Sequence, residues 1–533
     1  MTHPSTAAAS ATTTLVGSRA PSAYLVPLDK SEASEERSTT DTDLEAKDKG
    51  QSGPDTDDSE KSRIAERYPD NVVGWDGPDD PECPRNWSST KKFFFVAVTS
   101  AVISCVSFGS SVFGPAATVT AAEFDVPVIV MRLAVALWIL GFFTGPIFFG
   151  PLSELFGHVV VFSMCVVGLS LFQIPVAVAE NVQTILVCRF FSGVFGSAAF
   201  SVVSGMYVEL YEPIPRGVAL GMSSICINLG ATIAPIAGAY LTAGDGSEWR
   251  WTAWATLIIM CTFGVAALFG VRESSSRMIL RNKAKRLRFE TKNWALHAKS
   301  EETRVDLHDI LHRYLTKPVR MFVTEPILII FTVYLTLVYG TLYLSFQAFP
   351  IAFQERGWST QRSSLVFIAV MCGIISAWVV QSVFTLTWYK TQVTRLRNGP
   401  PPPEFRLPPM MAGAAVLPPS LLWFGWSGGV HPASQILASY FIGLGLMLIF
   451  VPGISYIVDV YGFHSNSAMS IHVVVRSLIA CSFPMFANIM YAQLGVAWAS
   501  SLLAFLCIAL APAPVLFWIY GKRIRSWSSF AFD

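Results

Sequence analysis

Beyond residue 92 the chain consists mostly of long apolar stretches that almost lack charge. Residues 1–92 hold 29 of the 75 Asp, Glu, Lys and Arg residues, and residues 272–325 hold another 20. The other 387 residues carry only 26. A soluble globular protein has about 25% charged residues, whereas this chain has 14%. The pattern predicts an all-α protein that crosses a membrane many times.

Twelve apolar segments of roughly 20 residues follow the first charged region, and each is long enough to cross a bilayer as a helix. Short links such as 180–184 and 492–495 predict antiparallel neighbours. We expect spans near residues 93–116, 128–149, 160–179, 185–209, 217–241, 251–271, 326–350, 363–386, 407–427, 434–458, 468–491 and 496–519.

The basic residues predict the orientation of these spans. The loops on one side, together with the C-terminal tail, hold 21 Lys and Arg residues, whereas the other side has only Arg250, Arg356 and Arg362. Positive charge marks cytoplasmic loops. An even number of spans puts the two chain ends on one side, so we expect both termini in the cytoplasm.

The second charged region divides the spans into six and six, which predicts two pseudosymmetric halves. The run Arg-Asn-Lys-Ala-Lys-Arg-Leu-Arg at 281–288 predicts a basic amphipathic helix on the inner membrane face. We expect a disordered cytoplasmic tail with a juxtamembrane signature at 1–92, the N-terminal half at 93–271, a cytoplasmic basic loop at 272–325, the C-terminal half at 326–519 and a cytoplasmic C-tail at 520–533.

Several function classes are excluded. All nine cysteines except Cys83 lie in apolar stretches without paired spacing, which indicates neither a disulfide framework nor a metal site. A net charge of +1 gives no field for nucleic acid. Neither a clustered His/Asp/Glu site, a nucleophile elbow nor a phosphate loop is found, so we do not expect an enzyme or a cofactor.

Five distinctive stretches follow one another along about residues 70–530. They are Trp-Asp-Gly-Pro-Asp-Asp-Pro at 75–81, a loop motif at 145–157, Arg-Phe-Phe-Ser-Gly-Val-Phe-Gly-Ser at 189–197, a Gly/Pro motif at 230–238 with Trp-Arg-Trp at 249–251, and a C-terminal signature formed by 459–462, Arg476 and 521–525. In this order they resemble the motifs of the major facilitator superfamily, and within it those of the fungal twelve-span drug:proton antiporters, which include multidrug and polyamine exporters. The resemblance implies a secondary transporter driven by the proton gradient.

The loop motif departs from the family pattern. Gly150 and Gly157 match it, but His158-Val159 stands where the family usually has two arginines. The family places an acidic residue at Glu154, and without those arginines Arg216 is a candidate partner.

Ionisable groups inside membrane helices are costly, so they are candidates for proton coupling and gating. Arg189 opens the fourth span and Arg476 lies within the eleventh; each has a structural alternative, as a hydrogen-bond donor between helices. The others lie near the cytoplasmic ends of spans, where pairing in a gate competes with snorkelling. The set is Arg189, Glu209, Arg216, Asp459, Arg476 and Glu154.

A substrate cavity is expected between the inward faces of spans 1, 4, 7 and 10. Tyr339, Tyr343 and Gln347 follow one another at intervals of four and should share a helical face. An aromatic cavity with few charges suits amphiphilic or neutral organic molecules and suits a polyamine poorly. Its predicted residues are Phe108, Phe113, Tyr207, Tyr339, Tyr343, Gln347 and Tyr456.

Two further features stand out. Arg132 lies one turn into the second span, where the family usually has an apolar residue; it either snorkels outward or contacts an anion at the outer mouth. Gly230 and Gly238 permit close helix approach, and Pro235 bends the span. The resemblance implies that this bend packs between the halves and limits proton leak.

The leading hypothesis is a proton-coupled exporter in the plasma membrane, with the vacuolar membrane as the second location. Its partners would be the lipid bilayer and a small molecule, such as a drug, a secondary metabolite, an organic acid or a glycolipid, and it would act as a monomer. Because no acidic residue is central in any span, a facilitator or nutrient importer stays open. A non-transporting membrane sensor is the alternative from another class.

Overall fold

The computed structural model describes residues 67–244, 247–302, 315–396 and 401–531. Residues 1–66, most of the predicted disordered tail, lie outside this part of the chain. Nearly all of the described structure is helical. The strands of the described residues, β1 (Val72–Val73) and β2 (His297–Ala298), form one short parallel pair.

Helices α2 to α9 form an N-terminal bundle. Two of the predicted spans are each divided into two helices, at Val112 and at Phe142–Phe143. The helices are α2 (Ser89–Ser111), α3 (Phe113–Glu123), α4 (Val128–Gly141), α5 (Thr144–Phe156), α6 (His158–Ala177), α7 (Val182–Leu210), α8 (Pro213–Leu241) and α9 (Arg250–Gly270), with the turn η2 (Ser247–Trp249) before α9.

Helices α12 to α21 form a C-terminal bundle, and α10 with its neighbours lies between the two in sequence. The turn η1 (Pro84–Asn86) precedes α2, whereas α10 (Ser276–Thr291) and η3 (Lys299–Glu301) lie between the bundles. The bundle contains α12 (Lys317–Thr324), α13 (Pro326–Gln354), α14 (Thr360–Ser364), α15 (Phe367–Phe384), the π-helical turn η5 (Thr385–Tyr389), α16 (Lys390–Arg395), η6 (Pro403–Arg406), α17 (Pro408–Trp426), α18 (Pro432–Tyr461), η7 (Gly462–His464), α19 (Ser465–Ala480), α20 (Phe483–Leu510) and α21 (Pro512–Arg525).

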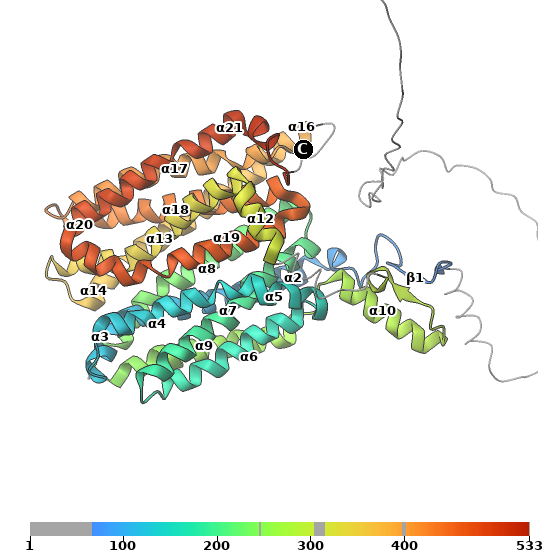
Figure 1. Ribbon diagram of the computed structural model, residues 1–533, viewed down its shortest axis with the longest axis horizontal. Coiled ribbons are helices and arrows are strands. Elements are labelled where there is room, and N and C mark those ends of the chain that lie inside the picture. Colours follow the sequence, from blue (N-terminus) through green and yellow to red (C-terminus); the bar gives the residue numbers. More distant parts are fainter. Residues whose placement is uncertain (1–66, 245–246, 303–314, 397–400, 532–533) are drawn as a thin grey trace, which may run out of the picture. The chain divides into compact units, whose positions relative to one another are not determined.

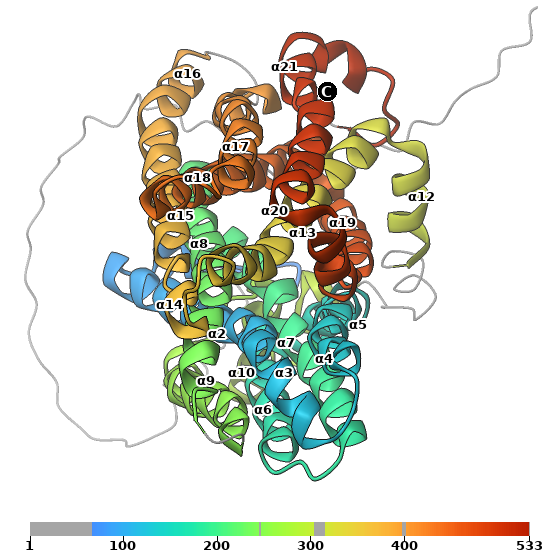
Figure 2. The ribbon, with the colours of Figure 1, turned by 90° about the vertical axis from the view of Figure 1, so that its left-hand side faces the viewer.

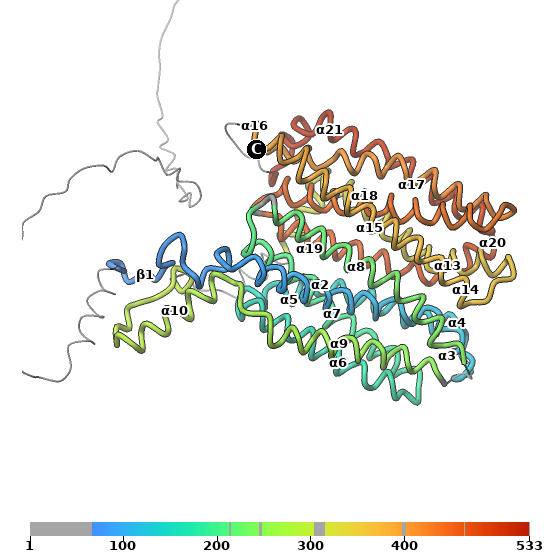
Figure 3. Tube along the Cα trace, turned by 180° about the vertical axis from the view of Figure 1, so that it is seen from behind, coloured from blue at the N-terminus to red at the C-terminus, as the bar shows by residue number. Residues whose placement is uncertain are grey.

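The two bundles lie side by side, with the N-terminal one in blue and green and the C-terminal one in yellow to red (Figure 1). The view turned by 90° and the view from behind agree on this arrangement (Figure 2, Figure 3). Helix α10, strand β1 and the C-terminal segment lie at one end of the bundles, and α3 and α14 lie at the opposite end. We call these the α10 end and the α3 end.

Ten helical stretches among the described residues are long and apolar enough to cross a membrane, against the twelve predicted. The predicted span at 407–427 is α17, and its four prolines lower its mean hydropathy. The predicted span at 468–491 is divided between α19 and α20. Helix α20 in turn runs into the next predicted span through a break at Gly495, where φ is 70°.

Apolar side chains cover the outside of the bundles as well as filling them. Trp138 and Phe162 are buried in the N-terminal core, and Phe331 in the C-terminal core. On the outer surface Leu171 is 60% exposed and Phe269 is 87% exposed. Exposing such side chains to water is unfavourable, whereas lipid tails solvate them. The surface is therefore that of a membrane protein.

The segment that precedes α2 is tied to α10 by a cluster that we call the clasp, formed by Asp76, Asp80 and Lys283. The Lys283 ammonium lies 2.7 Å from Asp76 Oδ1 and 3.3 Å from Asp80 Oδ2. The Asp80 carboxylate also accepts hydrogen bonds from the backbone N–H groups of Asp76 and Glu82, both at 2.8 Å. The sequence signature at 75–81 therefore serves to hold one lysine of the central loop.

Helix α10 is the basic helix expected around 281–288, and its buried face is occupied by protein. Ala284 and Leu287 pack with Tyr68 and Val73 in one small core. A bilayer is therefore not needed to cover this face, and the expected position of the helix on the inner membrane face stays a prediction.

Candidate functional site

The centre of the interface between the bundles contains the predicted aromatic face of α13. The hydroxyl groups of Tyr339 and Tyr343 are 3.3 Å apart, and their ring centroids are 5.0 Å apart. The Tyr343 hydroxyl also lies 3.3 Å from Ser110 Oγ of α2. Because Ser110 belongs to the N-terminal bundle, this hydrogen bond joins the two bundles.

Arg476 of α19 lies against the same face. Its guanidinium is 4.5 Å from the centroid of the Tyr339 ring and 5.3 Å from that of Phe450. These two rings are stacked at 6.0 Å. Arg476 Nε is buried without a hydrogen-bond acceptor, and Nε2 of His472, one turn earlier, is buried without a hydrogen-bond partner. The site thus combines aromatic walls with unused hydrogen-bonding capacity.

Arg132 makes a second link between the bundles. With the Asn488 amide oriented so that its oxygen faces Arg132, this oxygen accepts from all three guanidinium nitrogens, Nε at 3.2 Å. The Asn488 nitrogen then donates to Gln347 Oε1 at 2.6 Å, and Gln347 Nε2 donates to the Pro484 carbonyl at 3.1 Å. Arg132 therefore connects α4 to α13 and α20 rather than snorkelling outward.

Arg189 is buried among helices of its own bundle. Its Nε donates to the Ala134 carbonyl and its Nη2 to the Gly109 carbonyl, both at 3.0 Å. The guanidinium also faces the rings of Phe113 and Trp138 at 4.6 and 4.8 Å. These contacts are the structural alternative that the sequence left open, since they fasten α7 to α2 and α4.

The charged groups at the α10 end form separate pairs. Arg406 Nε lies 2.9 Å from Asp459 Oδ2, and Arg216 of α8 interacts electrostatically with the same carboxylate. Glu209 Oε2 accepts a hydrogen bond from the Ser276 hydroxyl at 2.6 Å. Asp459 therefore interacts with one arginine of each bundle.

The loop motif has its own set of contacts. Glu154 Oε2 forms an ion pair with Arg277 at 3.7 Å, a partner that sequence reasoning missed. The Glu273 carboxylate accepts hydrogen bonds from the backbone N–H groups of His158 and Val159, at 3.1 and 3.3 Å. An acidic group at a helix N-terminus satisfies free donors and the helix dipole. Glu273 thus stabilises the start of α6, at the position where the family usually has arginines.

The glycines of the family motifs lie at close contacts or turns. A Cβ added to Gly230 would lie 2.2 Å from the Ser104 carbonyl oxygen, and one at Gly238 would lie 2.3 Å from that of Val112. Both therefore approach the first span of their own bundle, at α2 and at Val112 just after it. The implied packing of the Pro235 bend between the halves stays a prediction. Gly157 joins α5 to α6 with φ of 93°, whereas Gly150 and Pro235 lie inside α5 and α8.

The remaining residues predicted to line the cavity have side chains that pack against, or hydrogen-bond to, neighbouring residues of the protein. The Tyr207 hydroxyl is bonded to Thr99 and Ser223, at 2.9 and 2.7 Å. Tyr456 stacks on Phe331 with ring centroids 4.6 Å apart, and Phe108 is buried against α8. The sequence analysis did not predict Asn488 or Ser110 as site residues. Asn488 could have been found, because it is a lone polar amide in an apolar stretch.

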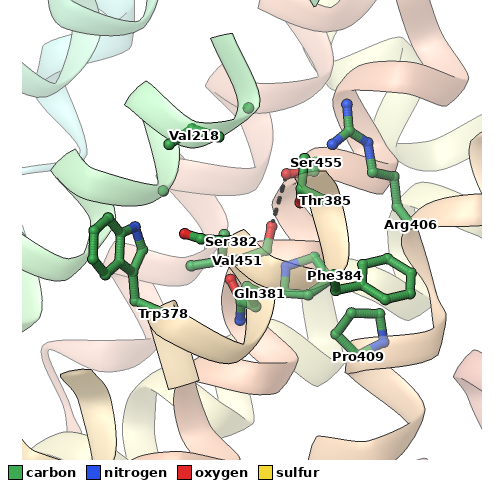
Figure 4. A pocket seen from close by; sticks show the side chains of 13 residues that line it. Val218, Trp378, Gln381, Ser382, Phe384, Thr385, Arg406, Pro409, Val451 and Ser455 are labelled. Carbon is green, nitrogen blue, oxygen red and sulfur yellow. Dashed lines mark hydrogen bonds between the residues drawn. The ribbon is translucent and has the colours of Figure 1, made fainter. Parts of the chain in front are cut away.

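A small pocket lies at the α10 end, between α8, α15 and α18. Trp378, Gln381 and Arg406 line it together with Val218 and Ser455, as Figure 4 shows. Its water-accessible volume of about 30 Å³ is room for one or two water molecules. It is too small for an organic molecule in this conformation.

Fold and site together define a multi-pass membrane protein with a polar, aromatic interface between two helical bundles. The chain belongs to the major facilitator superfamily, whose family model matches residues 99–484. This is a family of transporters, not of enzymes.

Similar curated proteins come from fungi. The citrinin biosynthesis cluster MFS transporter mrr1 of Monascus ruber is 41% identical over 86% of this chain and 92% of its own length. The ascochitine biosynthesis cluster MFS transporter of Didymella fabae is 42% identical over 87% of this chain and 90% of its own.

Solved structures agree on the fold. The proton:xylose symporter XylE bound to 6-bromo-6-deoxy-D-glucose has a TM-score of 0.59 at 16% identity, covering 81% of this chain and 96% of that chain. XylE from E. coli in a partially occluded inward-open conformation has a TM-score of 0.55 at 15% identity, covering 81% and 98%. At this identity the likeness concerns the fold alone.

Proposed function

We propose that this protein exports an organic small molecule by alternating access, coupled to protons. Its relatives named for citrinin and ascochitine biosynthesis clusters favour a secondary metabolite as cargo. The observation that carries the proposal is the interface where Tyr343, in contact with Tyr339 next to Arg476, meets Ser110 of the other bundle. Ligands that bind between two bundles can bias their relative arrangement.

In this proposal the two bundles contribute twelve spans. Helix α17 is the ninth span, and α19 with the first part of α20 is the eleventh. The termini lie in the cytoplasm, the membrane is the plasma membrane, and the protein acts as a monomer of the drug:proton antiporter group. The α3 end is then the outer side and the α10 end the inner side.

The links at the two ends are the proposed gates. At the outer side Arg132 and Asn488 hold the bundles together, and at the inner side Asp459 pairs with Arg406 while lying near Arg216. Glu209 and Glu154 are candidate proton carriers next to the inner gate, and Arg189 positions the helices between the gates.

The test compares metabolites in the culture medium of a strain that lacks the gene and of its parent, with and without a protonophore. We expect one compound to disappear from the medium of the mutant, and its export from the parent to stop when the protonophore collapses the gradient. Unchanged media and unchanged drug tolerance would contradict export.

A facilitator is the second candidate, because the contacts of Tyr339, Tyr343 and Arg476 within the described residues include no carboxylate that could carry a proton. Export that continues unchanged in the presence of the protonophore would favour it.

A further inference from the structure

Arg476 is partly buried, and it differs from Arg189 and Arg406 in having no oxygen partner. Arg189 donates to backbone carbonyls, and Arg406 is paired with Asp459. Within the described residues Arg476 has neither a hydrogen-bond acceptor nor an ion-pair partner, and its Nε is fully buried. Even a partly buried cation is unfavourable between membrane helices when it has neither an anion nor acceptors, so proteins retain one mainly where it has a function.

The rings beside Arg476 compensate the charge only in part. Tyr339 and Phe450 offer their faces at 4.5 and 5.3 Å, within the range of a cation–π contact. This contact uses the plane of the guanidinium and leaves its N–H donors, which lie at the edge, free. A planar aromatic group with an anionic oxygen complements both features, because its ring can stack while the oxygen accepts from the guanidinium.

The neighbouring groups supply no negative charge. The groups that interact electrostatically with Arg476 are the phenols of Tyr339 and Tyr343 and the imidazole of His472. Phenols are neutral near pH 7. Among the described residues at this site, therefore, the charge of Arg476 has no counter-ion, and a ligand could provide it.

Arg132, nearer the α3 end, likewise has no negatively charged partner among its described contacts. Its partner is the neutral amide of Asn488, which accepts hydrogen bonds without cancelling the charge. When the bundles separate at this end, the guanidinium loses Asn488 and is free to meet an anion. The interface thus carries two guanidiniums, on α4 and α19, whose described contacts lack a carboxylate.

We infer that the cargo is an aromatic organic acid, bound as its carboxylate to Arg476 with its ring against Tyr339 and Phe450. The inference rests on the proposed transport function and names its substrate class. It also changes an expectation from the sequence, since the sparse charge of the spans favoured neutral molecules. A monoanion needs only one such guanidinium, whereas the unpaired positive charge repels organic cations.

The test uses the full-length protein in lipid nanodiscs and three matched probes: 2-naphthoate, its methyl ester and the 2-naphthylmethylammonium cation. Binding is measured by calorimetry. We expect 2-naphthoate to bind at least tenfold more tightly than either of the others. Equal or tighter binding of the ester or the cation, or no binding of any probe, would overturn the inference.

Variants identify the residue. Arg476→Gln should weaken 2-naphthoate binding at least tenfold, and Arg476→Lys should retain part of it. Arg362→Gln, an exposed arginine of α14, is the matched control and should bind like the wild type. If Arg476→Gln does not fold, Arg476→Lys carries the test, and unchanged 2-naphthoate affinity in either folded variant contradicts the assignment.

Transport in proteoliposomes separates this inference from the proposed function. Binding of 2-naphthoate without movement of any probe across the membrane would refute transport and leave the anion site standing. Movement of the ester or the cation in preference to 2-naphthoate would refute the anion site and leave transport standing.

Discussion

The Lys283 ammonium of α10 lies 2.7 Å from the Asp76 carboxylate and 3.3 Å from that of Asp80, although these aspartates are about two hundred residues earlier in the chain. The Lys283 side chain is 4% exposed and that of Asp80 is 2% exposed. Residues before the first span are thereby held against the loop between the two bundles. The ion pair between Lys283 and Asp80 is the basis of the first two predictions.

Lys283→Met should release the clasp, because it leaves the buried Asp80 carboxylate without its cation. Breaking a buried pair in this way costs about 3–5 kcal/mol. We expect faster proteolysis of residues 67–88 and of α10 while the bundles stay folded. Lys285→Met is the matched control, since Lys285 is exposed on the same helix, and it should be cut at the wild-type rate.

The clasp should also respond to pH. Burial alone would raise the pKa of Asp80, but the hydrogen bonds from the Asp76 and Glu82 backbone and from Lys283 outweigh it and lower this pKa. A lowered folded-state pKa means that the stabilisation is present above the unfolded value, about 3.9, and is lost as the pH falls through the folded value. Burial would also lower the pKa of Lys283, but Asp76, Tyr68 and Asp80 raise it, so its contribution is lost only at strongly alkaline pH.

Hydrogen exchange of the Asp76 and Glu82 amides, corrected for intrinsic rates, measures this pH response. Their protection should be constant around neutral pH and fall below about pH 4. The fall should be absent in Asp80→Asn. Protection that stays constant down to pH 2 in the wild type would show that the carboxylate contributes nothing.

Gly230→Ala and Gly238→Ala should each lower the thermal stability of the detergent-solubilised protein. The new Cβ would lie 2.2 Å from the carbonyl oxygen of Ser104 in α2, or 2.3 Å from that of Val112 just after it, so the helices must separate. Overpacking of this kind costs about 1–3 kcal/mol. Gly114→Ala is the control, because a Cβ there meets nothing within 4 Å. Equal melting temperatures for all three variants would contradict the close contact of α8 and α2.

A double-mutant cycle should detect the link between Arg132 and Asn488. Arg132→Leu and Asn488→Leu remove the two partners singly and together. Residues in direct contact show a coupling energy of about 0.5–3 kcal/mol, and distant residues add within about 0.5 kcal/mol. Arg362→Leu combined with Asn488→Leu supplies the additive reference, and additivity of the Arg132 pair would mean that no link exists.

Hydropathy predicted most helices well, because long apolar runs leave few other structures in a membrane. It was less successful for the predicted span at 468–491, which is divided between α19, with its polar first turn, and α20. The spacing of Tyr339 and Tyr343 predicted their shared face, which their hydroxyl contact confirms.

Contacts between distant segments could not be predicted in this way. Nothing near Arg132 in the sequence indicates Asn488, and nothing near Asp80 indicates Lys283. Such pairs depend on how the helices are arranged in space, and periodicity within one helix carries no information about that. The structural role of Arg189 was likewise undecided until its carbonyl acceptors were known.

The hydrogen bonds from His158 and Val159 to Glu273 also bear on how the protein is made. Glu273, which completes the first turn of α6, lies 115 positions after His158 in the chain, so it is synthesised well after this turn. The N-terminal bundle therefore stays unfinished at this helix end until translation has passed α9. A nascent chain that stops earlier would present unsatisfied amides at this helix start to the quality-control machinery.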